Sequence, residues 1–403
     1  GPRRLWARSS PDARLPTGKR SARALSYAPS MCPAPDPTEP RVHAEAIVYR
    51  LFDVGYAIAL DRAFDLLASS APDRRRPSRG EAQTIQIPNP PVTVSLGSEN
   101  VDIGGRLVEA ELSARVFDFG VVSVRAKLSA HTGLGWEAFT QWGTAVTSTS
   151  WHDLLVRARD RLLARIAPAV EQPSISPLTE DYTLFRVNQL LDANGSPFPP
   201  ENLHDGEISR LLLGERRPLT ADARKELLSP RLAYFEDDLA VLTWSTALIV
   251  EPVATDTDVQ YVLEFANAQL LELRWYDSVL DAEVPAIQNR FVHARQGFRL
   301  LGRRYRVLLE ELQRRVADSV ELMERLENSL RVTDDVFLAR VYSAALEEFR
   351  ERAWRKGIER KLAIVREAYD MLNAESLARR SETLELIIVV LIMFEIALTL
   401  LRH

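Results

Sequence analysis

The feature that most constrains this chain is an apolar run near its C-terminal end, "ETLELIIVVLIMFEIALTLLRH". The stretch Leu386–Phe394 contains no polar residue, so a helix there is apolar on every face. About 20 helical residues span a bilayer core of about 30 Å, and the apolar side chains contribute roughly -4 to -8 kcal/mol to insertion. The segment predicts one transmembrane helix, a tail anchor over 383–401. A buried terminal helix of a soluble protein is the alternative.

Basic residues set the orientation of such an anchor. Arg366, Arg379 and Arg380 precede the segment, and Arg402 follows it. By the positive-inside rule, the N-terminal bulk of the chain is cytoplasmic, or faces the matrix from the inner membrane of a mitochondrion. The predicted partner of this segment is therefore a lipid bilayer.

One acidic residue stands inside the apolar run. Glu395 is a candidate functional residue, because an intramembrane acid usually has a function or a hydrogen bond across helices. Thr399 lies one helical turn further on and could accept a hydrogen bond from the neutral acid. The alternative is a tolerated residue near the far interface.

The N-terminal end has a different composition. Residues 1–43 are rich in Arg, Ser and Pro, and the first thirty residues contain a single acid, Asp12. This composition fits an organelle transit peptide, or residues upstream of a true start at Met31. In either case we expect 1–43 to be a disordered or misassigned leader that takes no part in the fold.

Residues 44–254 interleave strand and helix patterns. Alternating, β-branched stretches such as "LVEAELSARVFDFGVVSVRAKLSA" predict strands, and amphipathic stretches near Trp136–Val146 and Trp151–Ile166 predict helices. The apolar stretch "DLAVLTWSTALIVEP" predicts one central strand. Because strands and helices do not alternate strictly, the fold class of this domain is α+β.

A short echo links two strand ends. The stretch "RLFDVG" at Arg50–Gly55 returns as "RVFDFG" at Arg115–Gly120. Two strands that end in similar turns would produce it, and so would a duplicated α/β half.

Residues 255–382 read as long helices. Phe298, Tyr305 and Leu312 follow one another at seven-residue spacing, and the pattern fits a coiled-coil seam over Gln288–Arg331. A second helix carries Ile358 and Val365 at the same spacing. The stretch "RVTDD" separates the two helices, so we expect a long antiparallel coiled-coil hairpin. This hairpin is also the predicted surface for self-association or for a protein partner.

Composition narrows the function classes. Hydrophobic residues make up 46% of the chain, which supports a folded core, and the net charge of -5 carries no nucleic-acid signal. Cys32 is the only cysteine, so disulfide frameworks and thiolate zinc sites within the chain are excluded. The six histidines show no metal-ligand spacing, and no cofactor is predicted.

One pair of acids has a spacing that can carry chemistry. Asp277 and Asp281 are four residues apart on one helix face, where paired carboxylates can bind a metal or share a proton. The alternative is a solvated pair or an ion pair with Arg274. We therefore name Asp277, Asp281 and Arg274 as candidate functional residues.

Three stretches together resemble a known family. "FANAQLLELRWYDSVLDAEV", "DLAVLTWSTALIVEP" and "RRSETLELIIVVLIMFEIAL" are similar to segments of the Required for Meiotic Nuclear Division family, a domain of unknown function. The resemblance implies a membrane-associated protein with a C-terminal anchor. For mitochondrial members it implies support of organelle translation by tethering. It implies no catalytic residues.

We therefore expect a non-enzymatic, membrane-tethered scaffold or adaptor that presents a cytoplasmic α+β domain. The alternative is a membrane-anchored enzyme or ligand sensor that uses a pocket in this domain.

Overall fold

The computed structural model describes residues 39–74, 85–86, 89–215, 217–252, 258–296, 314, 331–332 and 336–401. Side chains are described for all of these except 85–86, 283–284, 286–296, 331–332, 369, 372–373, 375–383 and 399–401. The expected leader, 1–43, lies largely outside the described residues. The first strand nevertheless begins at Arg41, two residues before the expected end of the leader.

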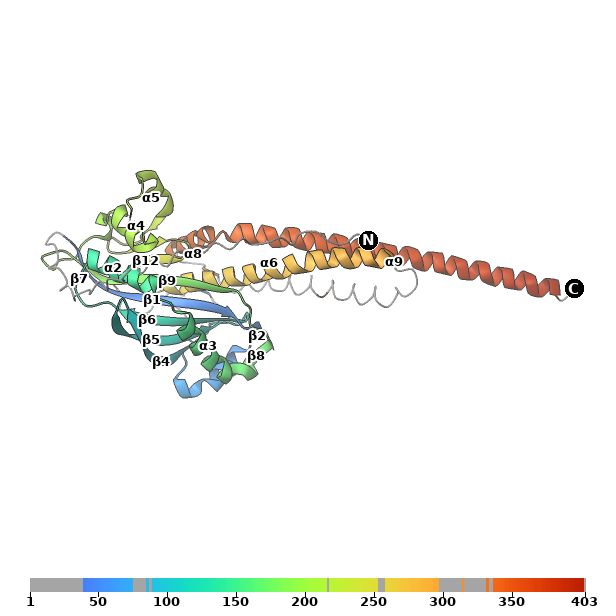
Figure 1. Cartoon of the computed structure of the whole chain (residues 1–403), viewed down its shortest axis with the longest axis horizontal. Helices are drawn as coiled ribbons and strands as arrows, with labels where there is room; N and C mark the ends of the chain where they lie inside the picture. Colours follow the sequence, from blue (N-terminus) through green and yellow to red (C-terminus); the bar gives the residue numbers. More distant parts are fainter. Residues whose placement is uncertain are drawn as a thin grey trace, which may run out of the picture. The chain divides into compact units, whose positions relative to one another are not determined.

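A mixed sheet forms the centre of the fold (Figure 1). Its strand order is β10-β11-β12-β9-β1-β6-β5-β4, and neighbours are antiparallel except β12 and β9. These strands are β1 Arg41–Asp53, β4 Val92–Ile103, β5 Arg106–Val116, β6 Val121–Ser129, β9 Thr179–Leu191, β10 Arg231–Leu232, β11 Leu239–Leu242 and β12 Thr246–Val250. Short strands outside this path are β2 Gly55–Ile58, β3 Ile85–Gln86, β7 Leu134–Gly135, β8 Val170–Pro173 and β13 Arg331–Val332. The predicted α+β class is confirmed.

Helices cover both faces of the sheet, because alternate side chains of each strand point to opposite faces. On β1, Val48 and Phe52 pack with the helices that precede β11, whereas Ile47 and Leu51 pack with the helices that follow β12. The first group comprises α1 Leu60–Leu66, α2 Trp136–Ser148, α3 His152–Ile166 and α4 Asp205–Leu213, with α5 Ala221–Leu227 beside α4. The second group comprises α6 Asp258–Gln296, α8 Val336–Glu348 and α9 Glu351–Leu401. The first half of α6 is therefore part of the domain core.

The expected single strand in "DLAVLTWSTALIVEP" is wrong. The stretch forms two antiparallel strands, β11 and β12, joined at Thr243. The Thr243 amide donates to the carbonyl of Thr246, and the hydroxyl of Tyr182 donates to the same carbonyl at 2.9 Å. Helices cover both faces of these strands, so every residue of β11 and β12 is buried and no alternation marked the turn.

The helices α6 and α9 lie side by side and run parallel (Figure 1). Arg274 lies over the ring of Trp354, and further along both helices Asp281 pairs with Lys361. The predicted apolar row of α9 is buried here, with Ile358 and Leu362 packed in the core on α6. The antiparallel coiled-coil hairpin is not confirmed, because most of its first helix, Gln288–Arg331, lies outside the described residues.

Among the residues whose positions are described, no helix is both long enough and apolar enough to cross a membrane. The transmembrane tail anchor predicted over 383–401 is therefore not supported. The expected hydrogen bond between Glu395 and Thr399 also stays untested, because the side chain of Thr399 lies outside the description. The apolar side chains from Leu384 to Phe394, and those of Ile396 and Leu398, are exposed.

The two echo segments meet at the ends of β1 and β5. The amide of Val54 donates to the carbonyl of Gly120 at 3.0 Å. Gly120 has a φ of +92°, and a Cβ added there would lie 1.8 Å from the carbonyl oxygen of Gly55. No side chain fits between these two turns, so glycine is required at position 120 by both its backbone angle and its neighbour.

Gly120→Ala is therefore expected to destabilise the fold by more than about 4 kcal/mol, because backbone must move to admit the methyl group. Gly105→Ala is the matched control. Its φ of +87° is similar, but nothing lies within 4 Å of an added Cβ, so we expect a cost of only about 1–2 kcal/mol. Chemical denaturation of both variants measures the difference. Equal midpoints would show that the close approach does not matter.

Candidate functional site

Polar side chains occupy one face of the strands β4, β5 and β6. This polar face is organised in cross-strand rows, which the register brings together. The rows are Thr93–Arg115–Ser123, Ser95–Ser113–Arg125 and Ser98–Glu111–Lys127. The opposite face of the same strands is apolar and belongs to the core on α1, α2 and α3. The polar face is the side that the start of α6 covers.

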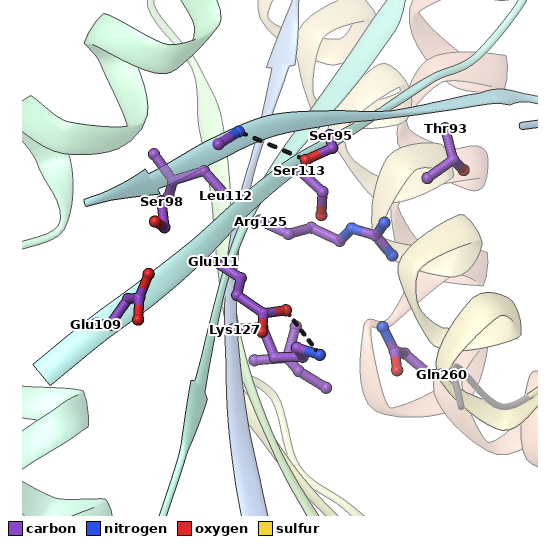
Figure 2. Close-up of a pocket in the computed structure, with 12 residues that line it drawn as sticks. Thr93, Ser95, Ser98, Glu109, Glu111, Leu112, Ser113, Arg125, Lys127 and Gln260 are labelled. Carbon is purple, nitrogen blue, oxygen red and sulfur yellow. Dashed lines mark hydrogen bonds and ion pairs between the residues drawn. The ribbon is translucent and has the colours of Figure 1, made fainter. Parts of the chain in front are cut away.

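A pocket of about 480 Å³ opens on this face (Figure 2). Strand β4 has a bulge between Ser95 and Gly97, at the rim of the pocket. Such bulges re-aim side chains and often adjoin functional sites. We call this cavity the polar pocket. Its lining residues are Ile47, Thr93, Ser95, Gly97, Ser98, Glu109, Glu111, Leu112, Ser113, Arg125, Lys127 and Gln260.

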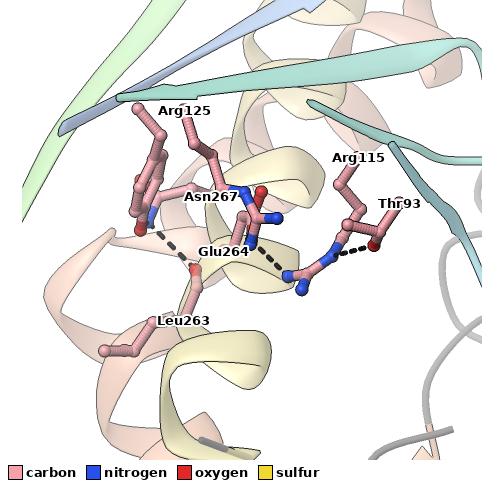
Figure 3. Close-up of polar contacts among 7 residues, drawn as sticks. Thr93, Arg115, Arg125, Leu263, Glu264 and Asn267 are labelled. Atoms are coloured by element: carbon pink, nitrogen blue, oxygen red, sulfur yellow. Dashed lines mark hydrogen bonds and ion pairs between the residues drawn. The ribbon is translucent and has the colours of Figure 1, made fainter. Parts of the chain in front are cut away.

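A buried charge cluster adjoins the polar pocket (Figure 3). Glu264 of α6 is fully buried, accepts a hydrogen bond from Arg115 and lies 3.6 Å from the guanidinium of Arg125. The side chain of Arg125 is 5% exposed and also lines the pocket. Taking these charges out of water costs several kcal/mol per ion before pairing offsets it. The cluster joins the sheet to α6 at the floor of the pocket.

Aromatic rings surround this charge cluster. The guanidinium of Arg115 lies 4.7 Å from the ring centre of Tyr261, a cation–π contact in a site shielded from water. Burial is the main reason that the pKa of the Tyr261 phenol is raised. One turn beyond Glu264, Asn267 donates to the hydroxyl of Tyr49 at 3.1 Å. Gln260, Glu264 and Asn267 thus form a polar stripe on α6 that faces the sheet.

Two further acids are buried between the sheet and α6. Asp53 ends β1, and Glu272 lies two turns beyond Glu264 on α6. Burial raises the pKa of Asp53 to about 7, against a weaker opposing effect from the Gly55 amide, which donates to its carboxylate. Burial also raises the pKa of Glu272, and the charge of Asp53 raises it further. This carboxyl pair therefore holds protons at a pH where exposed acids have lost them.

The predicted pair Asp277 and Asp281 binds a lysine of α9. Lys361 lies 2.7 Å from Asp277 and 2.6 Å from Asp281. Burial alone would lower the pKa of Lys361, but the hydrogen bonds to both aspartates and their charges together outweigh burial and raise it. Within the described part of the chain, no group of three or more His, Cys, Asp or Glu residues could hold a metal ion. The arrangement is a helix–helix ion pair.

The other two predicted residues lie apart from this pair and from each other. Arg274 pairs with Glu180 of β9, whose pKa burial raises despite the guanidinium. The proposed ion pair of Arg274 with the two aspartates is therefore replaced by one with the sheet. Glu395 is exposed near the end of α9. The structure thus brings Asp277 and Asp281 together and leaves Arg274 and Glu395 elsewhere.

Sequence reasoning missed Arg115, Arg125, Glu264 and Glu272. Two signals pointed to them. Every second residue is polar or charged from Glu109 to Arg115 and again from Ser123 to Ser129, and in "YVLEFANAQLLEL" single acids interrupt an apolar helix. Only the register of β5 and β6 and the packing of α6 show that Arg115 and Arg125 meet Glu264, and that Glu272 lies near Asp53.

The carboxyl pair predicts a pH dependence. Asp53 titrates near 3.8 when unfolded and near 7 when folded, so the folded chain binds more protons between these values. The free energy of unfolding should therefore fall as the pH rises from about 4 to 7. Glu272→Gln removes one ionisable member, so we expect a flatter pH profile and a higher melting temperature at pH 8.

Glu137→Gln is the matched control for that experiment. Burial would raise the pKa of Glu137, but the hydrogen bonds from Arg210 and Gln141, together with the charge of Arg210, outweigh burial and lower it. Its contribution is present above the unfolded pKa and is lost as the pH falls, which is the opposite slope. A Glu272→Gln variant that melts below the parent chain at pH 8 would contradict the assignment.

Comparison with known proteins identifies the family of this domain. The family model described as "Uncharacterized protein MJ0711, N-terminal domain" matches residues 43–257. The chain is 23% identical over 246 residues to the uncharacterized protein MJ0711 of Methanocaldococcus jannaschii, an alignment that covers 61% of this chain and 74% of the relative. No solved structure matches.

These matches do not support the name of the Required for Meiotic Nuclear Division family, which the sequence motifs resemble. They agree with that resemblance in one respect, since the matched domain is also of unknown function. The matched range contains the sheet path, apart from the first two residues of β1, and α1 to α5, and it ends just before α6 begins. The chain belongs to the family of the uncharacterized protein MJ0711 N-terminal domain.

Proposed function

We propose that this chain is a non-enzymatic scaffold that associates with a lipid bilayer through the end of α9. The observation that carries the proposal is the run of exposed apolar side chains from Leu386 to Phe394. Successive helix residues are turned by about 100°, so nine consecutive apolar residues expose apolar surface on every face. Soluble proteins seldom expose apolar surface of this extent, and it marks interaction sites.

The same helix shows what its apolar residues do when protein covers them. At Ile358, Leu362 and Val365 the apolar residues form one stripe, and that stripe is buried. Near the end of α9 the stripe becomes a full apolar surface, with Leu386 67% and Phe394 62% exposed. A single protein partner covers one side of a helix, whereas lipid covers all sides. The change in pattern favours a bilayer as the partner.

The charges around the run give the proposal an orientation. Arg379 and Arg380 precede the apolar residues and would lie at the negatively charged lipid surface. The α+β domain would then lie on the cytoplasmic side, or on the matrix side in a mitochondrion. In that position the domain can hold a protein assembly at the membrane. Ribosomes are among the assemblies to test, because the motif resemblance implies a link to translation.

A ligand sensor or enzyme is the second candidate, and the polar pocket favours it. The pocket lies in the α+β domain and has a buried guanidinium at its floor. Pockets of this size commonly hold small molecules. The bilayer tether and ligand sensing involve different parts of the chain and can both hold, whereas an enzyme would exclude the non-enzymatic reading.

Vesicle flotation of the full chain tests the tether. We expect the chain to float with anionic vesicles, and Leu391→Lys to reduce the floating fraction severalfold, because a central lysine costs about 3 kcal/mol in the apolar phase. Glu395→Leu should strengthen binding if this acid is only tolerated. Weaker binding of Glu395→Leu would assign the acid a role in membrane association.

The control for Leu391→Lys must lie on α9 at a position that does not pack on α6. Glu367→Lys, at an exposed position of α9 before the apolar run, is the matched control and should float like the parent chain. A parent chain that stays with the soluble fraction, or that forms helix-mediated oligomers in place of binding vesicles, would refute the tether.

A further inference from the structure

The polar pocket has a chemistry that identifies a class of ligand. We propose that it binds a small molecule through an anionic group, a carboxylate or a phosphate, held at Arg125. This inference rests on the second candidate function, ligand binding by the α+β domain, and it is independent of the membrane tether.

The floor of the pocket presents hydrogen-bond donors. The row Ser95–Ser113–Arg125 places two hydroxyl groups beside the guanidinium, and Gln260 adds an amide from α6 (Figure 2). A guanidinium offers N–H donors in a fork that matches the two oxygens of a carboxylate or phosphate. Glu264, 3.6 Å away, restrains the side chain from behind. This end of the pocket therefore suits an anion.

Burial distinguishes this site from an ordinary solvated sheet face. On the polar face, Ser123 is fully buried and Arg125 is 4% exposed, so water does not compensate them as it would at a surface. Neighbouring strands carry apolar residues on the same face, including Ile47, Leu51 and Leu184. Apolar residues would thus fit beneath α6, and replacing buried ions by apolar groups is often neutral or stabilising. The guanidinium of Arg125 pairs with Glu264 and also lines the pocket, so it can contact an anion there while it joins the sheet to α6.

The opposite end of the pocket is acidic. Glu109 lies four residues before Ser113 on β5, which is about 13 Å along a strand. Between these ends, Lys127 and Glu111 form an ion pair at 2.8 Å. The pocket lining thus changes from basic at Arg125 to acidic at Glu109. A ligand that fits it has its anionic group at Arg125 and hydroxyl or amine donors toward Glu109. A volume of about 480 Å³ holds a metabolite-sized molecule.

The test uses the full chain in detergent with two probes, inorganic phosphate and succinate, at constant ionic strength against chloride. Melting temperature and titration calorimetry are the measurements. We expect saturable stabilisation by one of the two probes, which also tells a phosphate site from a carboxylate site. Ser113→Leu fills the pocket beside Arg125 and should raise the apparent Kd at least about tenfold, as should Arg125→Lys, which keeps the charge but loses the fork.

Ser129→Leu is the matched control, since this residue ends β6, is exposed and lies outside the pocket lining. It should bind the probe like the parent chain. If Ser113→Leu does not fold, Lys127→Gln tests the pocket from a partly exposed position, with weaker binding expected. Absence of saturable binding by both probes, or equal Kd values for the pocket variant tested and Ser129→Leu, would overturn the proposal.

The two proposals fail separately in these experiments. Ser113→Leu should float with vesicles like the parent chain, and Leu391→Lys should retain anion binding. A parent chain that binds an anionic probe but does not float with vesicles refutes only the tether. A parent chain that floats with vesicles but binds neither probe refutes only the ligand site.

Discussion

The contact of Glu264 with Arg115 and Arg125 is the constraint on which much of this structure depends. It fixes α6 on the sheet in one register, because a shift of one helical turn would place the uncharged side chain of Gln260 or Asn267 opposite the buried guanidinium groups. A buried ion pair is weak evidence for stability, but removal of one partner costs about 3–5 kcal/mol. The position of α6 in turn fixes the place of Gln260 in the polar pocket, the partners of α9 and the burial of Glu272.

Local patterns were sufficient to predict most elements of the α+β domain. The alternation in β5 and β6 and the apolar stripe of α3, from Leu155 to Ile166, both depend on one face being buried and the other exposed. The pattern failed at β11 and β12, where both faces are buried and a turn at Thr243 leaves no change in polarity. The parallel pairing of α6 and α9 was not predictable either, since it depends on contacts between residues about 80 positions apart, such as Asp281 and Lys361.

The candidate site was predictable only in part. Paired spacing indicated that Asp277 and Asp281 act together, but their partner is a lysine on another helix, which spacing within α6 cannot show. The residues of the pocket floor come from three strands and one helix. Each is unremarkable in its own segment, and the site exists because the strand register brings Ser95, Ser113 and Arg125 into one row.

The continuity of α9 has a mechanical consequence. This helix runs without interruption from Glu351 to Leu401, a length of roughly 75 Å, and contains no proline. Its first turns pack on α6, and α6 packs on the floor of the polar pocket. A helix of this kind transmits an axial pull with little loss. Tension at its apolar end would load the contacts of Lys361 with α6 in shear, where several side chains share the force at once.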